Sequence, residues 1–350
     1  MKWLALAILL IMPLASAIDL GGFQQCDGKI TGKYLPAGLE GKISCYEKGE
    51  HIMDLIYNND SIEISIQFFD VLNKVVERNQ FLKEELEKAL MEEALAPINL
   101  SGASFELGYE GCIIELHDIP TRFLRVKCDE IIISGFDYEI NKTSENMLKL
   151  QKTNFSATLF SYSPVEVNES CIIAKNEIMI VSFSYAEEKK IEDAFEEKSI
   201  GGEITIADYD ENKVDYISYF GNVSVSLSEI KTGKIVLDVS GDEKSGGKII
   251  KVNLGKNVCL TDKLKIKFDR ELIKRADNLE DILNPDDDGI TPEYYIVQSK
   301  DGMFLLVTIP HFSTHQLIIQ FVSGGIIEKT VAILLGFLTI AVATIYLFKK

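Results

Sequence analysis

The chain has 350 residues, and its 54 acidic side chains outnumber its 36 basic ones to give a net charge of −18 at pH 7. This balance excludes nucleic acid as a partner, because phosphate binding needs a clustered positive surface. The length suits two domains of about 100–200 residues each. We interpret the acidic surface as a solvated one, with cation binding or colloidal stability in salt as the alternative.

The first 17 residues have the pattern of a secretory signal. Lys2 precedes an apolar stretch from Trp3 to Leu14, and residues 15–17 are small, as signal peptidase requires. We therefore expect residues 1–17 to direct the chain out of the cytoplasm and to be removed from the mature protein.

Six cysteines in an exported chain indicate disulfides, because such a chain leaves the reducing cytoplasm. They are Cys26, Cys45, Cys112, Cys128, Cys171 and Cys259. Closeness in sequence favours bonds between the first and second and between the third and fourth, which leaves the fifth with the sixth, although other pairings stay open. The middle bond is best supported, since strand-like runs at 113–116 and 123–126 flank a turn. No C-x-x-C occurs, so zinc has no support.

Alternating apolar and polar residues predict half-buried strands through most of the chain. The clearest runs are residues 62–68, 203–206, 222–227 and 234–239. Their turn signals are typical of antiparallel sandwiches rather than of βαβ sheets. The sequence therefore predicts a mainly β fold with two β-sandwich-like domains, an N-terminal one at 18–200 and a membrane-proximal one at 201–322.

One long amphipathic helix is expected in the first domain, over residues 70–96, because its apolar residues recur at spacings of mostly three and four. The stripe contains Leu72, Val75, Val76, Leu82, Leu86 and Leu90. Pro97 ends the helix. We expect the stripe to dock on its own domain; pairing with a second subunit as a short coiled coil is the alternative.

Six Asn-x-Ser/Thr sequons lie between the two apolar ends of the chain. They are Asn59, Asn99, Asn141, Asn154, Asn168 and Asn222. Because none has proline in its middle position, all six are candidate glycosylation sites in an exported chain. The alternative is that these asparagines are ordinary turn residues.

A short charged helix is predicted at residues 187–197, and Gly201-Gly202 just after it marks the expected domain boundary. In the second domain, Asp277 and Glu280 have the spacing of a capping box that starts a helix of one to two turns. A hairpin is expected to turn at residues 300–302.

The acidic turn formed by Asp286, Asp287 and Asp288 is the candidate metal site of the sequence. Calcium takes oxygen ligands from such loops, but the spacing of an EF-hand loop is absent. We interpret the turn as a solvated one, with calcium as the alternative and no other cofactor indicated.

His311 and His315 are four residues apart in a segment that resembles a strand. In extended chain the two rings would be about 13 Å apart, too far to share a metal, so His311 is expected at a strand end, hydrogen-bonded. No serine-hydrolase elbow, zinc-protease motif or P-loop occurs. The sequence therefore indicates a protein that is not an enzyme.

The C-terminal end carries an apolar run of nineteen residues without a charge, 330–348. At about 1.5 Å per residue it can cross a hydrocarbon core of roughly 30 Å. Residues 323–329 are a linker, and the basic tail at 349–350 is expected to stay in the cytoplasm. The sequence thus predicts a single-pass membrane protein whose body lies outside the cell.

The membrane-proximal segment also carries a run of distinctive motifs. They are Ala276-Asp277, Asp281-Ile282-Leu283-Asn284-Pro285, Glu293-Tyr294-Tyr295, Leu306-Val307-Thr308-Ile309 and Pro310-His311-Phe312-Ser313. This segment resembles the C-terminal β-domains of archaeal cell-surface proteins, in which a His-Phe-Ser strand precedes the membrane anchor. The resemblance implies a structural, anchor-proximal module. The chain lacks the Pro-Gly-Phe tripeptide of one form of that class, so sortase-like processing is not implied.

The combined expectation is a cell-surface glycoprotein with a structural or interaction role in an archaeal-type envelope. Its expected partners are membrane lipid, through the C-terminal helix, and other envelope proteins. The alternative function is a solute- or cation-binding sensory ectodomain that works with a separate membrane partner.

Overall fold

A computed structural model describes the body of the chain. The described residues are 24–26, 29–31, 40–58, 61–66, 99–100, 104–117, 121–152, 155–182, 189–209, 214–220, 222–242, 244, 246–255, 257–258, 263–285, 289–299 and 302–322. They are mainly β, as expected, and they fall into two compact units that divide between Ile200 and Gly201. The predicted signal, the helix at 70–96 and the segment 323–350 lie outside the described residues. Within the described part, no helix is long and apolar enough to cross a membrane.

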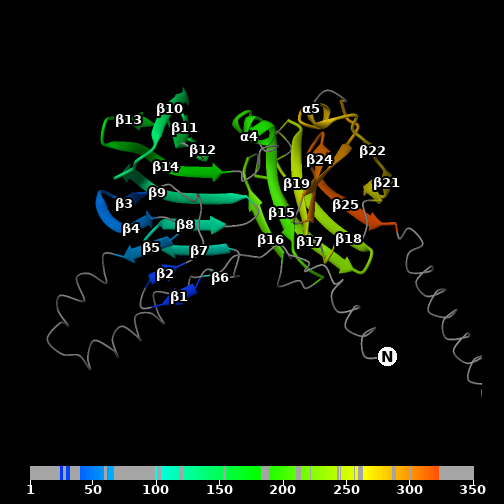
Figure 1. Cartoon of the computed structure of the whole chain (residues 1–350), viewed down its shortest axis with the longest axis horizontal. Helices are drawn as coiled ribbons and strands as arrows, with labels where there is room; N and C mark the ends of the chain where they lie inside the picture. The colour runs from blue at the N-terminus through cyan, green and yellow to red at the C-terminus, as the bar shows by residue number, and fades with distance from the viewer. Residues whose placement is uncertain are drawn as a thin grey trace, which may run out of the picture. The chain divides into compact units, whose positions relative to one another are not determined.

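The first unit is built from one hairpin and one large branched sheet (Figure 1). Its elements are β1 (Gln24–Cys26), β2 (Lys29–Thr31), β3 (Gly41–Glu47), β4 (Glu50–Asn58), β5 (Ser61–Ile66), β6 (Asn99–Leu100), β7 (Ser104–Tyr109), β8 (Cys112–His117), β9 (Arg122–Ser134), β10 (Glu139–Ser144), β11 (Met147–Lys152), β12 (Phe155–Ser161), β13 (Glu166–Val167), β14 (Cys171–Ser182) and α4 (Lys189–Glu196). The sheet runs β10-β11-β12-β14-β9-β3-β4-β5, and β6, β7 and β8 branch from it at β9.

Strand β9 makes the branch possible because it has two different partners on one edge. Its first half pairs with β8 and its second half with β3, while β14 pairs along its whole length. The register shifts at Asp129, which is an extra residue opposite β14. This bulge shifts the alternation of inward- and outward-facing side chains by one residue. Val126 before the bulge and Ile131 after it therefore both lie in the buried core.

The core of the first unit contains a disulfide between Cys112 and Cys128, which confirms the expected bond between adjacent strands. The other two expected pairings are wrong in the structure, because Cys45 and Cys171 are free thiols. Cys45 points into the apolar core, where burial raises the pKa of its thiol to about 12. Cys171 instead donates its thiol to Asn168 at 3.1 Å. The side chain of Cys26 and the whole of Cys259 lie outside the described residues.

Helix α4 covers part of the sheet face that points away from the core of the first unit. It lies within residues 187–197, for which a helix was predicted. Lys149 of β11 contacts Glu192 at 3.4 Å and Glu196 at 3.1 Å. Ser156 and Thr158 of β12 also donate to these two carboxylates. Partial burial opposes the charge of Lys149, but the two carboxylates outweigh burial and raise its pKa. Polar pairs therefore fix this face of the helix to the sheet.

The second unit is a sandwich of two sheets. Its elements are β15 (Ile200–Ile206), β16 (Val214–Ser218), β17 (Ser224–Lys231), β18 (Lys234–Ser240), β19 (Lys248–Gly255), β20 (Leu264–Phe268), β21 (Glu271–Leu272), β22 (Lys274–Arg275), α5 (Leu279–Ile282), β23 (Glu293–Ser299), β24 (Gly302–Ile309) and β25 (Thr314–Phe321). The sheet orders are β16-β15-β19-β24-β23-β22 and β17-β18-β25-β20-β21.

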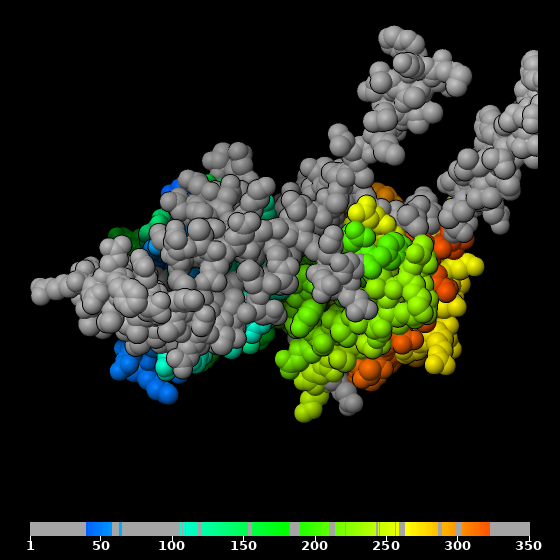
Figure 2. Space-filling view, turned by 90° about the horizontal axis from the view of Figure 1, so that it is seen from below, coloured from blue at the N-terminus to red at the C-terminus, as the bar shows by residue number. Residues whose placement is uncertain are grey.

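The core of the second unit lies between these sheets. Val252 of β19 and Leu305 of β24 come from one sheet, and Leu237 of β18 and Leu317 of β25 from the other. All four are fully buried. In the space-filling view of Figure 2, neighbouring residues of this unit, coloured green through orange, contact one another at the surface. The expected β-sandwich is thus present in this unit.

Two details of the second unit bear on the sequence expectations. The hairpin of β23 and β24 is confirmed, with Ser299 paired to Gly302. The cap of α5 differs from the expectation by one residue, because Asn278 and not Asp277 accepts the backbone N–H of Asp281. The Asp281 carboxylate accepts the backbone N–H of Asp277 at 2.8 Å. The cap therefore starts one residue later than predicted, and the Asp281 carboxylate binds the N–H of the residue before the N-cap rather than that of the N-cap itself, as a capping box would.

Candidate functional site

Besides the polar contacts of α4, three clusters of polar side chains within the described residues are candidates for a functional site. One lies on the sheet of the first unit and two lie in the second unit. No group of three or more His, Cys, Asp or Glu side chains in the described part of the chain is arranged to hold a metal ion. The contacts within each cluster are hydrogen bonds and ion pairs.

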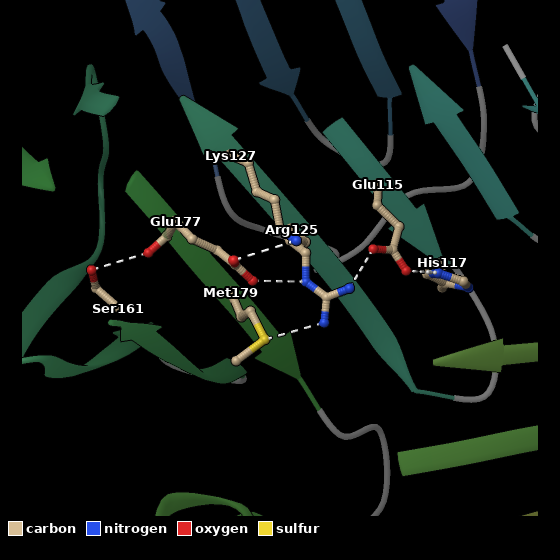
Figure 3. Close-up of polar contacts among 7 residues, drawn as sticks. All are labelled: Glu115, His117, Arg125, Lys127, Ser161, Glu177 and Met179. Carbon is tan, nitrogen blue, oxygen red and sulfur yellow. Dashed lines mark hydrogen bonds and ion pairs between the residues drawn. The ribbon is translucent and has the colours of Figure 1, made fainter. Parts of the chain in front are cut away.

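The cluster of the first unit, the Arg125 network, crosses strands β8, β9 and β14 (Figure 3). Arg125 donates from Nη1 to Oε2 of Glu115 at 2.5 Å, and the other oxygen of Glu115 is 2.8 Å from Nε2 of His117. Burial alone raises the pKa of Glu115. The hydrogen bond from His117 and the charge of Arg125 outweigh burial and hold the pKa below its ordinary value.

The other side of the Arg125 network is built on β14. Nε of Arg125 lies 3.1 Å from Glu177 Oε1, and Lys127 Nζ lies 3.4 Å from Glu177 Oε2. Arg125 also donates from Nη2 to the sulfur of Met179, and Ser161 donates to the carbonyl oxygen of Glu177. The charged groups of the network therefore pair with one another. It ties three strands together.

The Glu203 cluster, formed by Glu203, Thr205, Tyr219, Lys251 and Asn253, is the most deeply buried polar group of the second unit. Glu203 Oε1 lies 3.4 Å from Lys251 Nζ and 2.6 Å from Asn253 Nδ2, and Oε2 accepts from Tyr219 at 3.0 Å. Asn253 also donates to Thr205 at 3.1 Å. Glu203 and Lys251 are each 1% exposed. Burying such a pair is costly unless hydrogen bonds from neighbouring groups accompany it, as they do here.

The third cluster, the His315 site, contains Asp269, Ser313 and His315, with Phe268 and His311 around the imidazole. Nδ1 of His315 lies 2.7 Å from Asp269 Oδ2, and Nε2 lies 3.0 Å from the hydroxyl oxygen of Ser313. The imidazole stacks on Phe268 with ring centroids 4.6 Å apart. Asp269, His315 and Ser313 are therefore linked in a row by hydrogen bonds.

Strand pairing explains how these residues meet. Alternation along β25 turns His315 inward, in line with Leu317, so the ring sits at the end of the sandwich core. Asp269 follows β20 directly, and its positive φ of 48° turns the chain toward β25. Its backbone N–H donates to the Gln316 carbonyl, and its Oδ1 accepts the Gln316 N–H, each at 2.9 Å. The carboxylate is thereby fixed beside the imidazole.

Electrostatics favour the ionised carboxylate of Asp269. Partial burial raises its pKa, but the hydrogen bonds from the Gln316 N–H and from His315, with the charges of His315 and His311, outweigh this and lower the pKa below the ordinary 3.8. A carboxylate held in this way orients an imidazole and stabilises its protonated form.

The lowered pKa of Asp269 predicts a pH dependence of stability. Because the folded-state pKa lies below the unfolded one, the stabilisation is present above the unfolded pKa and is lost as the pH falls through the folded value. We expect the stability difference between the wild type and D269N to shrink as the pH falls below about 4. Urea titrations between neutral and acidic pH measure it. An unchanged difference down to the acid limit contradicts the assignment.

The expected separation of the two histidines is wrong. The ring centroids of His311 and His315 are 5.0 Å apart rather than about 13 Å, because the chain bends at residues 310–313 instead of staying extended. The acidic turn from Asp286 to Asp288, interpreted as solvated with calcium as the alternative, lies outside the described residues. Sequence reasoning missed all three clusters, and the Ser-x-His spacing was the only local signal of the His315 site.

The sequons differ in their surroundings. Asn141 donates its side-chain amide to Gln151 at 2.8 Å. In Asn168 the amide oxygen accepts from the backbone and hydroxyl of Ser170, within the sequon itself. Asn222 has a positive φ of 50°, as turn asparagines often do. Asn59, Asn154 and the side chain of Asn99 lie outside the described residues.

Comparison with protein-family models finds no match, and comparison with curated proteins finds none either. The fold and the three clusters are therefore the basis for assigning a function.

Proposed function

We propose that this chain is a single-pass cell-surface glycoprotein with a structural or interaction role in an archaeal-type envelope. Both β units stand outside the cell, and residues 330–348 hold the chain in membrane lipid. The signal pattern, the apolar C-terminal run and the sequons support this location. A disulfide within the first unit is consistent with an oxidising compartment.

The observation that carries the proposal is the place of β25 in its sheet. This strand is the last element before the predicted anchor, and it lies between β18 and β20 rather than at an edge. Its residues pair with 234–240 on one side and with 264–268 on the other. A pull along β25 must break hydrogen bonds on both sides, whereas an edge strand would peel from one side. This arrangement suits a module that joins a body to an anchor.

The use of charge in the first unit also supports a scaffold. The Arg125 network and the Lys149 contacts with α4 pair opposite charges between neighbouring elements. Such pairs in partly buried positions hold strands in register and add specificity more than stability. We propose other envelope proteins as the partners of the exposed acidic surface, and glycans at sequons such as that of Asn168, which is exposed.

Fractionation of cells that express the full chain tests the anchor. We expect the protein to stay with the membranes after an alkaline carbonate wash and to be released by detergent. A variant carrying Leu335→Lys and Leu338→Lys keeps the length of the apolar run but places two charges in the bilayer, at about 2.5–3.5 kcal/mol each. We expect this variant to be released by the wash.

The matched control for the anchor test is Leu264→Lys, which changes a partly exposed residue of β20 and leaves the apolar run intact. This control should stay with the membranes. Recovery of the wild type as a soluble cytoplasmic protein with reduced thiols contradicts the proposal, as does a doubly charged variant that resists the wash.

A further inference from the structure

We propose that Ser313, His315 and Asp269 form a hydrolytic site that transfers the acyl group of a small carboxylic ester to water, with Ser313 as the nucleophile. This activity goes beyond the structural role proposed above and does not depend on it. The site lies at the end of the second unit where β25 begins.

The hydrogen bonds give each group a defined role. The ionised Asp269 carboxylate accepts only, so Nδ1 of His315 carries the proton between them, at 2.7 Å. Nε2 then presents its lone pair to the Ser313 hydroxyl at 3.0 Å. In this tautomer the imidazole is a general base for the serine, and the carboxylate stabilises the imidazolium that forms.

The base is held rigidly while the nucleophile is open to solvent. His315 is 5% exposed and is fixed by stacking on Phe268 and by pairing of its backbone with Val239 in β18. Ser313 precedes β25 and is exposed, so an ester carbonyl can reach its oxygen. Preorganisation of this kind lets a base act without a conformational search.

A purely structural role for these residues predicts a different chemistry. A buried imidazole needs partners for both nitrogens, and Asp269 and Ser313 supply them. A structural hydroxyl forms no covalent adduct, and this difference separates the two interpretations.

His311 adds a second imidazole at the site. It is exposed, its ring centroid lies 5.0 Å from that of His315, and its charge acts on Asp269. We assign to His311 the hydrogen bond that stabilises the oxyanion of the tetrahedral intermediate, a contact that typically contributes about 10²–10³-fold in rate.

The reaction balances with an ester and water alone. As the Ser313 oxygen bonds to the carbonyl carbon, its proton moves to Nε2 of His315. The bond from that carbon to the alcohol oxygen then breaks, and the alcohol leaves with the proton from Nε2. Water attacks the acyl-serine, its proton passes through Nε2 to the Ser313 oxygen, and the carboxylic acid is released.

The test uses the full chain purified in detergent, with p-nitrophenyl acetate as substrate and a fluorophosphonate as covalent probe. We expect an initial burst of nitrophenol, and one phosphonyl group on the peptide that contains Ser313 by mass spectrometry. S313A should lose both signals. Thr314→Ala is the matched control, since Thr314 is the neighbouring exposed hydroxyl, and it should keep both.

The roles of the other residues are separated kinetically. D269N should lower kcat by on the order of 10³–10⁴ with KM unchanged, because it disturbs the tautomer and not the binding of substrate. H311A should lower kcat by about 10²-fold. Circular dichroism should show every variant folded. The absence of an adduct in the wild type, or an adduct and turnover that persist in S313A, overturns the proposal; an unchanged rate in H311A overturns the oxyanion assignment.

Discussion

Glu203→Ala is expected to lower the free energy of unfolding of the second unit by about 3–5 kcal/mol. The substitution removes the carboxylate that contacts Lys251, Asn253 and Tyr219. Lys251, at 1% exposed, then stays buried without that counter-charge. A buried ammonium without its carboxylate is costly, because the desolvation of the charge is no longer offset. Urea denaturation followed by circular dichroism measures the change.

Tyr219→Phe is the matched control for this prediction. It keeps the ring and the ion pair and removes one hydrogen bond to Glu203, so it should cost only about 1–2 kcal/mol. If Glu203→Ala costs no more than Tyr219→Phe, the carboxylate does not offset the charge of Lys251, and the electrostatic account of the Glu203 cluster is wrong.

Loss of the disulfide between Cys112 and Cys128 is the second large effect. The bond closes a loop with a sequence separation of 16, for which the chain-entropy estimate is about 3 kcal/mol. The double variant C112A/C128A should therefore lower the free energy of unfolding of the first unit by about that amount. Denaturation of the oxidised wild type and of the variant, both without reductant, gives the difference.

Cys45→Ala provides the control for the disulfide prediction. Cys45 lies in the same core but is a free thiol, so its substitution removes one buried sulfur without opening a loop, and we expect a loss of about 1 kcal/mol. Reductant should destabilise the wild type and Cys45→Ala and leave C112A/C128A unchanged. A wild type insensitive to reductant shows that the bond does not stabilise the unit.

Local pattern was sufficient to predict most of the strands. The hairpin of β8 and β9 was predicted with its disulfide, and the hairpin of β23 and β24 with its turn, because alternation and turn residues act over a few positions. The branching of the first sheet was beyond such reasoning. The extra residue at Asp129 reverses the alternation within β9, and only the pairing of β9 with three other strands reveals it.

The functional clusters depend on long-range pairing in the same way. Asp269 and His315 are 46 residues apart, and they meet because β20 pairs with β25. Glu203 and Asn253 are 50 residues apart and meet through β15 and β19. The histidine separation was wrong for a local reason, since the bend after Pro310 was treated as extended chain. The free thiol of Cys45 shows that closeness in sequence alone does not decide which cysteines pair.

Digestion of intact cells by proteinase K is the most direct test of the central claim, that both units stand outside the cell on a C-terminal anchor. The chain carries a tag before residue 40, and the tag is detected after digestion. A cytoplasmic enzyme is measured in the same cells as the control for lysis. Our account predicts that the tagged fragment is lost from intact cells while the cytoplasmic enzyme stays whole. A tagged chain that survives on intact cells and is cut only after lysis contradicts the account.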